Sequence, residues 1–295
     1  MTGGLEHSQW SGKTDGLPWM QKSLVVMLRF LPMWLLYGIM ALVLPFYMIF
    51  GKGFRATFVY YRNAFHSGCF KSCLYVYKNY FQFGQVVLDR FAYYAGKKFR
   101  ITVDGMELFR EMERRPEGFV TFSAHVGNYE MAGYALATEL KTMNALVYAQ
   151  ESEVVMNNRK SQFDSHRIRM VPVAPDMSHL FALNAALDEG NIVSVPVDRI
   201  YGSQKCAEIP FFGRMAKFPL GGFALAAQKG VDALSIFVMK ESYCAYHVYV
   251  QPVGYDKTAP RQERAMQLGR NYVAQLERIL KIYPTQWYNY FDLWV

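Results

Sequence analysis

The stretch FSAHVGNYE, residues 122–130, places a histidine and a glutamate five positions apart, directly behind the apolar run 119–122. Imidazole is the side chain that most readily takes up and returns a proton near neutral pH. A carboxylate hydrogen-bonded to one ring nitrogen fixes the tautomer and makes the other nitrogen a better base. His125 and Glu130 therefore predict general-base catalysis, in which the imidazole removes a proton from a hydroxyl or an amine.

This chemistry requires a turn between a strand and a helix. On an ideal helix, five residues place two side chains about 140° apart, so we expect His125 to precede the helix and Glu130 to reach back from its first turn. Gly127 supplies backbone freedom and Asn128 is a good N-cap. The residues alone leave a structural interpretation equally open, in which Glu130 favours the helix dipole and His125 only completes the strand.

Other catalytic groups fit the sequence less well. Ser123 lies near His125 but not within a G-x-S-x-G turn, which disfavours a serine nucleophile. The six histidines are dispersed and H-E-x-x-H is absent, which disfavours zinc. Four cysteines without a CxxC pair indicate small buried thiols rather than a metal site or a disulfide; they are Cys69, Cys73, Cys206 and Cys244. We therefore expect no metal.

Strands and helices alternate after residue 98, which predicts an α/β fold with a mixed, mostly parallel sheet flanked by helices. The expected strands are 99–103, 118–122, 145–148, 170–173, 192–197, 233–239 and 246–253, and the expected helices are 106–115, 178–189, 218–229 and 261–282. In such folds, sites form where the chain leaves the carboxyl ends of strands. His125 lies at one such end, and Asp198 and Arg199 lie at another.

The N-terminal part predicts contact with a membrane. Residues 30–50 carry no charge and are long enough to cross a hydrocarbon core of roughly 30 Å as a helix. Because Pro32 and Pro45 interrupt this run, a spanning helix, a re-entrant segment and a hairpin on the surface all stay open, with a buried core helix as the structural alternative. Residues 56–94 predict one or two helices. We divide the chain into a membrane-associated helical region, 1–95, and an α/β domain, 96–295.

Composition narrows the class of partner. Aromatic residues make up 16% and charged residues only 19%, a bias expected at a membrane surface. The net charge of +8 suits an anionic partner, which is nucleic acid, an acidic phospholipid or an acidic carrier protein. Nucleic acid is disfavoured because the basic residues are scattered and no motif that reads DNA or RNA is present.

The block SAHVGNYE resembles the H-x4-[DE] block of the lysophospholipid acyltransferase superfamily, and most closely the branch of bacterial late acyltransferases of lipid A biosynthesis. The hydrophobic N-terminal segment, SVPVDRIYG, IPFFGRMAKFPLGGFALAAQKG and YPTQWYNYFDLW resemble that branch in the same order. The resemblance implies transfer of a fatty acyl chain from acyl carrier protein or coenzyme A to a lipid acceptor, with a lipid A precursor as the first candidate. It implies His125 as general base, Glu130 as the group that orients it, no cofactor, and the cytoplasmic face of the bacterial inner membrane.

The resemblance also implies a set of substrate-binding residues. These are Asn128, Arg159, Asp198, Arg199, Phe212, Gly213, Arg214 and Lys217. Asp198-Arg199-Ile200 departs from the Asp-Gln-Asp type of sequence common in the family, which leaves the role of Arg199 open. Many relatives place a threonine near Lys217, which leaves the acceptor open among a lipid A precursor, a lysophospholipid and an aminoacyl lipid.

Three interpretations remain at this stage. The first is the acyltransferase, the second is a lipid esterase or thioesterase in which the same histidine activates water, and the third is a non-catalytic lipid-binding protein of the same fold. The terminal aromatic residues have two interpretations as well, an interfacial belt or packing under the last helix; they are Trp287, Tyr288, Tyr290 and Trp294.

Overall fold

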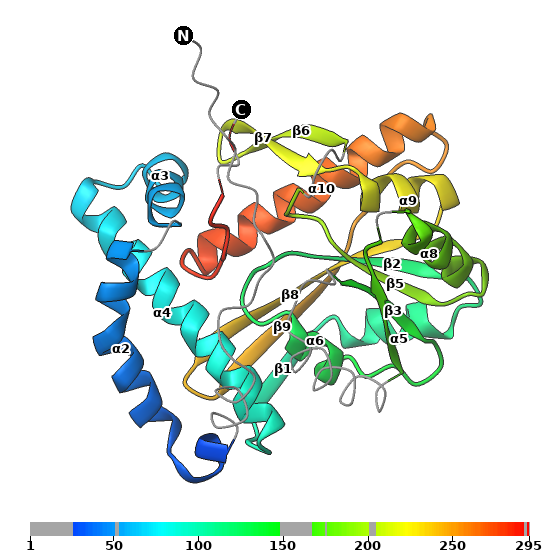
Figure 1. Ribbon diagram of the computed structural model, residues 1–295. Helices are drawn as coiled ribbons and strands as arrows, with labels where there is room; N and C mark the ends of the chain where they lie inside the picture. Colours follow the sequence, from blue (N-terminus) through cyan, green and yellow to red (C-terminus); the bar gives the residue numbers. More distant parts are fainter. Residues whose placement is uncertain are drawn as a thin grey trace.

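The computed structural model describes residues 26–50, 53–147, 167–174, 176–200, 205–291 and 294. Helices cover a seven-stranded sheet, and the helices of the N-terminal part stand together at one side of it (Figure 1). The prediction of an α/β fold with a mixed, mostly parallel sheet flanked by helices is therefore confirmed.

All seven predicted strands are present and belong to one sheet. They are β1 (Arg100–Asp104), β2 (Phe119–Ser123), β3 (Met143–Val147), β4 (Ile168–Pro172), β5 (Ile192–Pro196), β8 (Ala233–Ser242) and β9 (Ala245–Pro252). Their order is β1-β9-β8-β2-β5-β3-β4, and every neighbouring pair is parallel except the antiparallel hairpin of β8 and β9. The central strand β2 is an apolar run because helices cover it on both faces.

Helices cover the two faces of the sheet unequally. One face carries α5 (Met106–Arg114) and α6 (Glu130–Ala135), and the other carries α8 (Ser178–Asp188), α9 (Gly221–Lys229) and α10 (Arg261–Ile282). Strand side chains alternate between the two layers, so that Ile192 of β5 joins one apolar cluster while Val193 and Val195 join the other. The long helix α10 buries one face through apolar residues spaced three or four apart, which include Leu268, Tyr272 and Leu276.

A two-stranded antiparallel hairpin lies outside the main sheet and was not predicted. It consists of β6 (Cys206–Phe211) and β7 (Arg214–Pro219), joined by a turn at Phe212 and Gly213, both with positive φ. Because β7 extends to Pro219, the helix expected over 218–229 begins only at Gly221. The turn lacks the asparagine or aspartate that usually marks such a hairpin in a sequence.

The helices before the sheet pack onto the α/β body. They are α2 (Met33–Phe50), α3 (Phe54–Ala64) and α4 (Cys69–Tyr94), so the prediction of one or two helices over 56–94 is met by two. Tyr61 of α3 and Val76 of α4 share an apolar cluster with Trp287 near the C-terminus. The inner side of α2, including Leu36, packs on Phe91 of α4.

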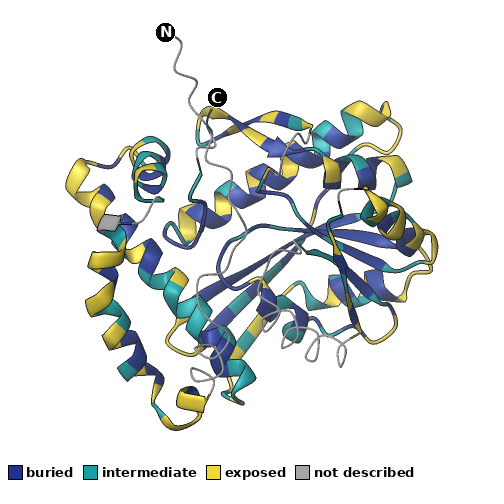
Figure 2. Ribbon diagram, viewed as in Figure 1, coloured by how far each residue is buried: buried dark blue, intermediate teal, exposed yellow. Residues whose placement is uncertain are grey.

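The outer side of α2 and of the helical turn before it is apolar and exposed (Figure 2). Phe30, Trp34, Leu42 and Phe46 follow one another at steps of four or eight residues, and each is between 64 and 81% exposed. Within the described ranges, none of the helices is both long and apolar enough to cross a bilayer. The helix α2 begins directly after Pro32, which lacks the backbone N–H that the interior of a helix requires.

Candidate active site

The turn that carries His125 connects β2 to α6 and is tied down on both sides. The N–H of Gly127 donates to the carbonyl of Gln286 (2.8 Å), and the N–H of Asn128 donates to the carbonyl of Val238 (2.8 Å). The carbonyl of His125 itself accepts a hydrogen bond from the N–H of Tyr288 (3.0 Å). The catalytic turn, residues 125–130, is therefore held between β8 and the segment 284–288.

Gly127 is required by this close approach. Its φ is +49°, a region that costs other residues energy, and a Cβ built on it would stand 1.9 Å from the carbonyl oxygen of Val238. The backbone freedom expected of this glycine is confirmed. It lets the chain reverse direction within hydrogen-bonding distance of β8.

The carboxylate that contacts His125 is that of Asp198. Parallel pairing sets Ser123 of β2 opposite Pro196 of β5, and His125 and Asp198 each follow by two residues. The two side chains therefore leave adjacent strands side by side. His125 Nδ1 lies 2.8 Å from Asp198 Oδ1, while Asp198 Oδ2 accepts the backbone N–H of His125 (2.9 Å) and the indole N–H of Trp287 (3.1 Å).

Asp198 is buried and charged. Burial acts to raise the pKa of its carboxyl, but the positive charge and hydrogen bonds of His125, together with Arg199, hold that pKa at about 2, below the ordinary 3.8. An ionised carboxylate only accepts hydrogen bonds, so in the neutral form of His125 the Nδ1 atom must donate and Nε2 carries the lone pair. The pair thus provides a base at Nε2 and a fixed negative charge behind it.

The predicted contact between Glu130 and His125 is wrong. Glu130 lies in the first turn of α6, as expected, but its buried carboxylate faces α4, where it accepts hydrogen bonds from Arg90 Nη1 (2.8 Å) and from the Tyr94 hydroxyl (3.0 Å). A guanidinium is a stronger partner for a buried carboxylate than a neutral imidazole. His125 meanwhile has Asp198 beside it on the neighbouring strand.

Asn128 does not cap the helix with its side chain, contrary to the prediction. The N-cap of α6 is Tyr129, without a side-chain cap, and Asn128 Nδ2 donates instead to the Tyr246 hydroxyl (3.4 Å). Asn128 is buried. Its side chain therefore binds the turn to β9 rather than to the start of α6.

A cavity of about 190 Å³ opens beside His125 at the carboxyl edge of the sheet. Its walls are mainly apolar and come from both layers of helices, with His125, Glu130 and Arg199 among the polar residues that line it. Apolar wall residues include Ala132, Met143 and Ile236 from the α6 layer, and Leu183, Val195 and Leu225 from the α8 and α9 layer. Such a space suits a hydrocarbon chain.

Of the remaining predicted residues that the structure describes, Arg199 lines the cavity. Arg199 Nη2 donates to the carbonyl of Tyr288 (3.1 Å) at the cavity. Phe212, Gly213, Arg214 and Lys217 lie on the β6–β7 hairpin and are not among the described residues that line it. Arg159 lies outside the described residues. Of the terminal aromatic residues, Trp287 and Tyr288 are buried, which matches packing rather than a belt.

Several residues that hold the site were not singled out from the sequence. The sequence predicts either an interfacial belt or packing for Trp287, and it predicts no role in the site for Gln286, Arg90 and Tyr94. The sequence does show the polar pair Asp198 and Arg199 after β5, and polar residues after a buried strand indicate a site. That signal does not extend to the residues of α4 or of the segment 284–288. Across the described residues, no group of three His, Cys, Asp or Glu side chains is arranged to hold a metal ion.

Three comparisons with known proteins bear on this site. The family model for bacterial lipid A biosynthesis acyltransferase matches residues 88–294, well over half of the chain. Among solved structures, the crystal structure of the 1-acyl-sn-glycerophosphate (LPA) acyltransferase PlsC from Thermotoga maritima is similar at 14% identity and a TM-score of 0.40, covering 92% of this chain and 100% of that chain. At those values the likeness carries no functional argument. The curated proteins gave no match.

Proposed function

The chain belongs to the bacterial lipid A biosynthesis acyltransferase family, and from this premise we propose that it transfers a fatty acyl chain from a thioester donor to a lipid acceptor, with His125 as the general base. The supporting observation is the His125–Asp198 pair at the edge of an apolar cavity. A base with a fixed charge behind it and a space for hydrocarbon beside it are what acyl transfer to a lipid requires.

In the proposed reaction, Nε2 of His125 removes a proton from the hydroxyl or amine of the acceptor while its oxygen or nitrogen attacks the thioester carbonyl. Asp198 stabilises the imidazolium through Nδ1–H. When the tetrahedral intermediate collapses, the carbon–sulfur bond breaks and the imidazolium returns the proton to the departing thiolate. The products are the acylated acceptor and a free thiol.

The two substrates are proposed to approach from different sides. The acyl chain occupies the apolar cavity. The donor is acyl carrier protein or acyl-coenzyme A, and Arg214 and Lys217, exposed on β7, supply positive charge for the acidic carrier or the phosphates of either donor. The first candidate for the acceptor is a lipid A precursor, ahead of a lysophospholipid or an aminoacyl lipid.

The exposed side of α2 is proposed to rest on the membrane that supplies the acceptor. Its apolar stripe would be costly in water over so many adjacent residues, and a helix can bury such a face in the headgroup boundary without crossing the bilayer. Acyl thioesters are cytoplasmic metabolites, so the membrane in question is the bacterial inner membrane at its cytoplasmic face.

The proposal is tested by acyl transfer with purified protein in mixed micelles. The assay supplies acyl carrier protein or coenzyme A thioesters together with each of the three candidate acceptors, and mass spectrometry identifies the product. We expect His125→Ala to abolish transfer and to remain folded, since His125 lies in a turn at the cavity. The matched control is His247→Ala. His247 also pairs with carboxylates, those of Asp104 and Glu241, but it lies on β9 of the β8–β9 hairpin.

Two outcomes contradict the proposal. Product formation by His125→Ala at the wild-type rate refutes His125 as the base. Release of free fatty acid at the same rate with and without acceptor identifies an esterase or thioesterase instead. Mass spectrometry of lipids from cells with and without the active protein then identifies the acceptor as the lipid that gains an acyl chain.

A further inference from the structure

The C-terminal part of α4 faces the segment that carries His125. Arg90 and Tyr94, one helical turn apart, both donate to the Glu130 carboxylate at the end of the catalytic turn. The ring of Tyr93 stacks on that of Tyr134 in α6, with centroids 4.2 Å apart and planes 21° from parallel. The helix that follows His125 is thus fastened to α4 by charge and by stacking.

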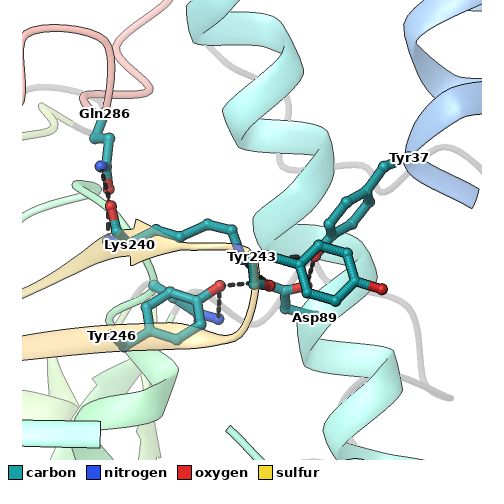
Figure 3. Close-up of polar contacts among 7 residues, drawn as sticks. Tyr37, Asp89, Lys240, Tyr243, Tyr246 and Gln286 are labelled. Atoms are coloured by element: carbon teal, nitrogen blue, oxygen red, sulfur yellow. Dashed lines mark hydrogen bonds and ion pairs between the residues drawn. The ribbon is translucent and has the colours of Figure 1, made fainter. Parts of the chain in front are cut away.

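Asp89, the neighbour of Arg90, joins α4 to three other elements. Its fully buried carboxylate accepts hydrogen bonds from Tyr37 of α2, Lys240 of β8 and Tyr246 of β9 (Figure 3). Burial lowers the pKa of Lys240 and raises that of Tyr246 well above its ordinary value, so the phenol stays protonated and donates. The Asp89 carboxylate therefore connects α4 to α2, β8 and β9 through three hydrogen-bond donors.

Two routes lead from Asp89 to the catalytic turn. By the first, the Tyr246 hydroxyl that donates to Asp89 accepts a hydrogen bond from Asn128 Nδ2 (3.4 Å). By the second, Gln286 brackets the backbone of Lys240, accepting its N–H (2.8 Å) and donating to its carbonyl (2.7 Å), as Figure 3 shows, while the carbonyl of Gln286 accepts the N–H of Gly127 (2.8 Å).

We propose that Asp89 and Arg90 are positioning residues, which hold the catalytic turn at its middle and at its C-terminal end so that His125 meets its substrates in a reactive arrangement. Asp89 acts on Gly127 and Asn128, and Arg90 acts on Glu130. The inference rests on the proposed function of His125. It gives Glu130 a role different from orienting the imidazole, and it makes α4 part of the active site although it precedes the sheet.

The test compares two tyrosines that donate to the same carboxylate. Tyr246→Phe and Tyr37→Phe each remove one phenol from Asp89, and Tyr246 connects onwards to Asn128 whereas Tyr37 leads to α2. We expect Tyr246→Phe to lower kcat for acyl transfer about tenfold at unchanged KM, since a small misplacement of a reacting group has effects of this order or larger. Tyr37→Phe should keep kcat within about twofold at a similar loss of thermal stability.

A second readout does not depend on activity. Hydrogen–deuterium exchange of the peptide that contains residues 125–131 should be faster in Tyr246→Phe than in Tyr37→Phe. Should Tyr246→Phe fail to fold, Tyr94→Phe replaces it, with Tyr93→Phe as its control, because only Tyr94 donates to Glu130. Arg90→Met should lose rate in the same way, and Arg90→Lys should restore part of it.

Equal kcat in Tyr246→Phe and Tyr37→Phe overturns the proposal, as does faster exchange without any fall in kcat. The pH dependence of the rate should keep its shape in every variant, because the His125–Asp198 pair is untouched; a shifted profile would mean an electrostatic role instead. Full activity of His125→Ala would defeat the proposed function separately, and the exchange comparison would then decide alone whether α4 holds the turn.

Discussion

Replacing Asp198 by asparagine removes one charge and nearly no volume, and its effect can be worked out from the structure. The surroundings hold the pKa of Asp198 at about 2 instead of 3.8, which corresponds to a free energy on the order of 2 kcal/mol in favour of the carboxylate. His125 is the largest favourable contributor, and coupling between two charges is reciprocal. The imidazolium formed during transfer therefore loses stabilisation on the order of 2 kcal/mol, which corresponds to roughly 30-fold in rate.

Hydrogen bonding adds to this loss. Three N–H groups point at the two oxygens of Asp198, from the His125 backbone, the His125 ring and Trp287. Asparagine has one oxygen and brings two donors of its own, so at least one of these groups loses its acceptor. We expect kcat to fall by about 30-fold or more while KM for both substrates changes little, because Asp198 is buried behind His125.

The assay is steady-state acyl transfer with thermal unfolding measured in parallel. Asp104→Asn is the matched control, since Asp104 also pairs with a histidine, His247, at 3.0 Å but on the surface, and it should leave the rate unchanged. The wild type should also lose stability in acid, because a carboxyl with a lowered pKa contributes stability above the unfolded value of 3.8 that is lost as the pH falls towards 2. A folded Asp198→Asn enzyme with more than half of the wild-type kcat would falsify the assignment.

Three further predictions address the turn, the fold and the cavity. Gly127→Ala should abolish transfer and destabilise the protein, because its Cβ would stand 1.9 Å from a carbonyl oxygen, whereas Gly254→Ala, with open space around it, should be neutral in both assays. Glu113→Gln should lower the free energy of unfolding by about 2 kcal/mol at neutral pH, because the carboxylate accepts the N–H groups of Glu139, Leu140 and Lys141. Burial acts to raise the pKa of Glu113, but these hydrogen bonds and Arg110 lower it below the ordinary 4.5. The carboxylate therefore contributes to folding stability above pH 4.5. The difference in the free energy of unfolding in urea between variant and wild type should shrink as the pH falls below that value. Ala145→Met should narrow the cavity and shift the preferred acyl donor to chains about two to four carbons shorter, whereas Ala185→Met, exposed on α8, should keep the wild-type preference in a donor competition assay.

Much of the fold followed from local patterns. The apolar runs predicted all seven strands of the sheet, and the spacing of apolar residues predicted α10 with its observed bounds, Arg261–Ile282. His125 was expected where a strand ends and was found there. These features depend on periodicity within short segments, which a sequence displays directly.

The partner of His125 could not be predicted in the same way. Asp198 lies 73 residues beyond His125 and comes near it only because β2 and β5 are neighbours in register. Strand order and register depend on tertiary packing, whereas Glu130 was close in sequence and therefore seemed the natural partner. The buried Asp89–Lys240 pair was hidden for a related reason, since isolated charges in a helix or strand usually indicate a solvated face.

The segment 284–288 supplies the acceptor for Gly127, the donor to the carbonyl of His125 and the indole that steadies Asp198. Translation delivers these residues after every strand of the sheet has been made. A growing polypeptide therefore carries the apolar outer face of α2 long before the groups that hold the turn 125–130 have been made. Until this segment folds into place, Asp198 lacks its indole donor and the turn 125–130 lacks two of its backbone hydrogen bonds.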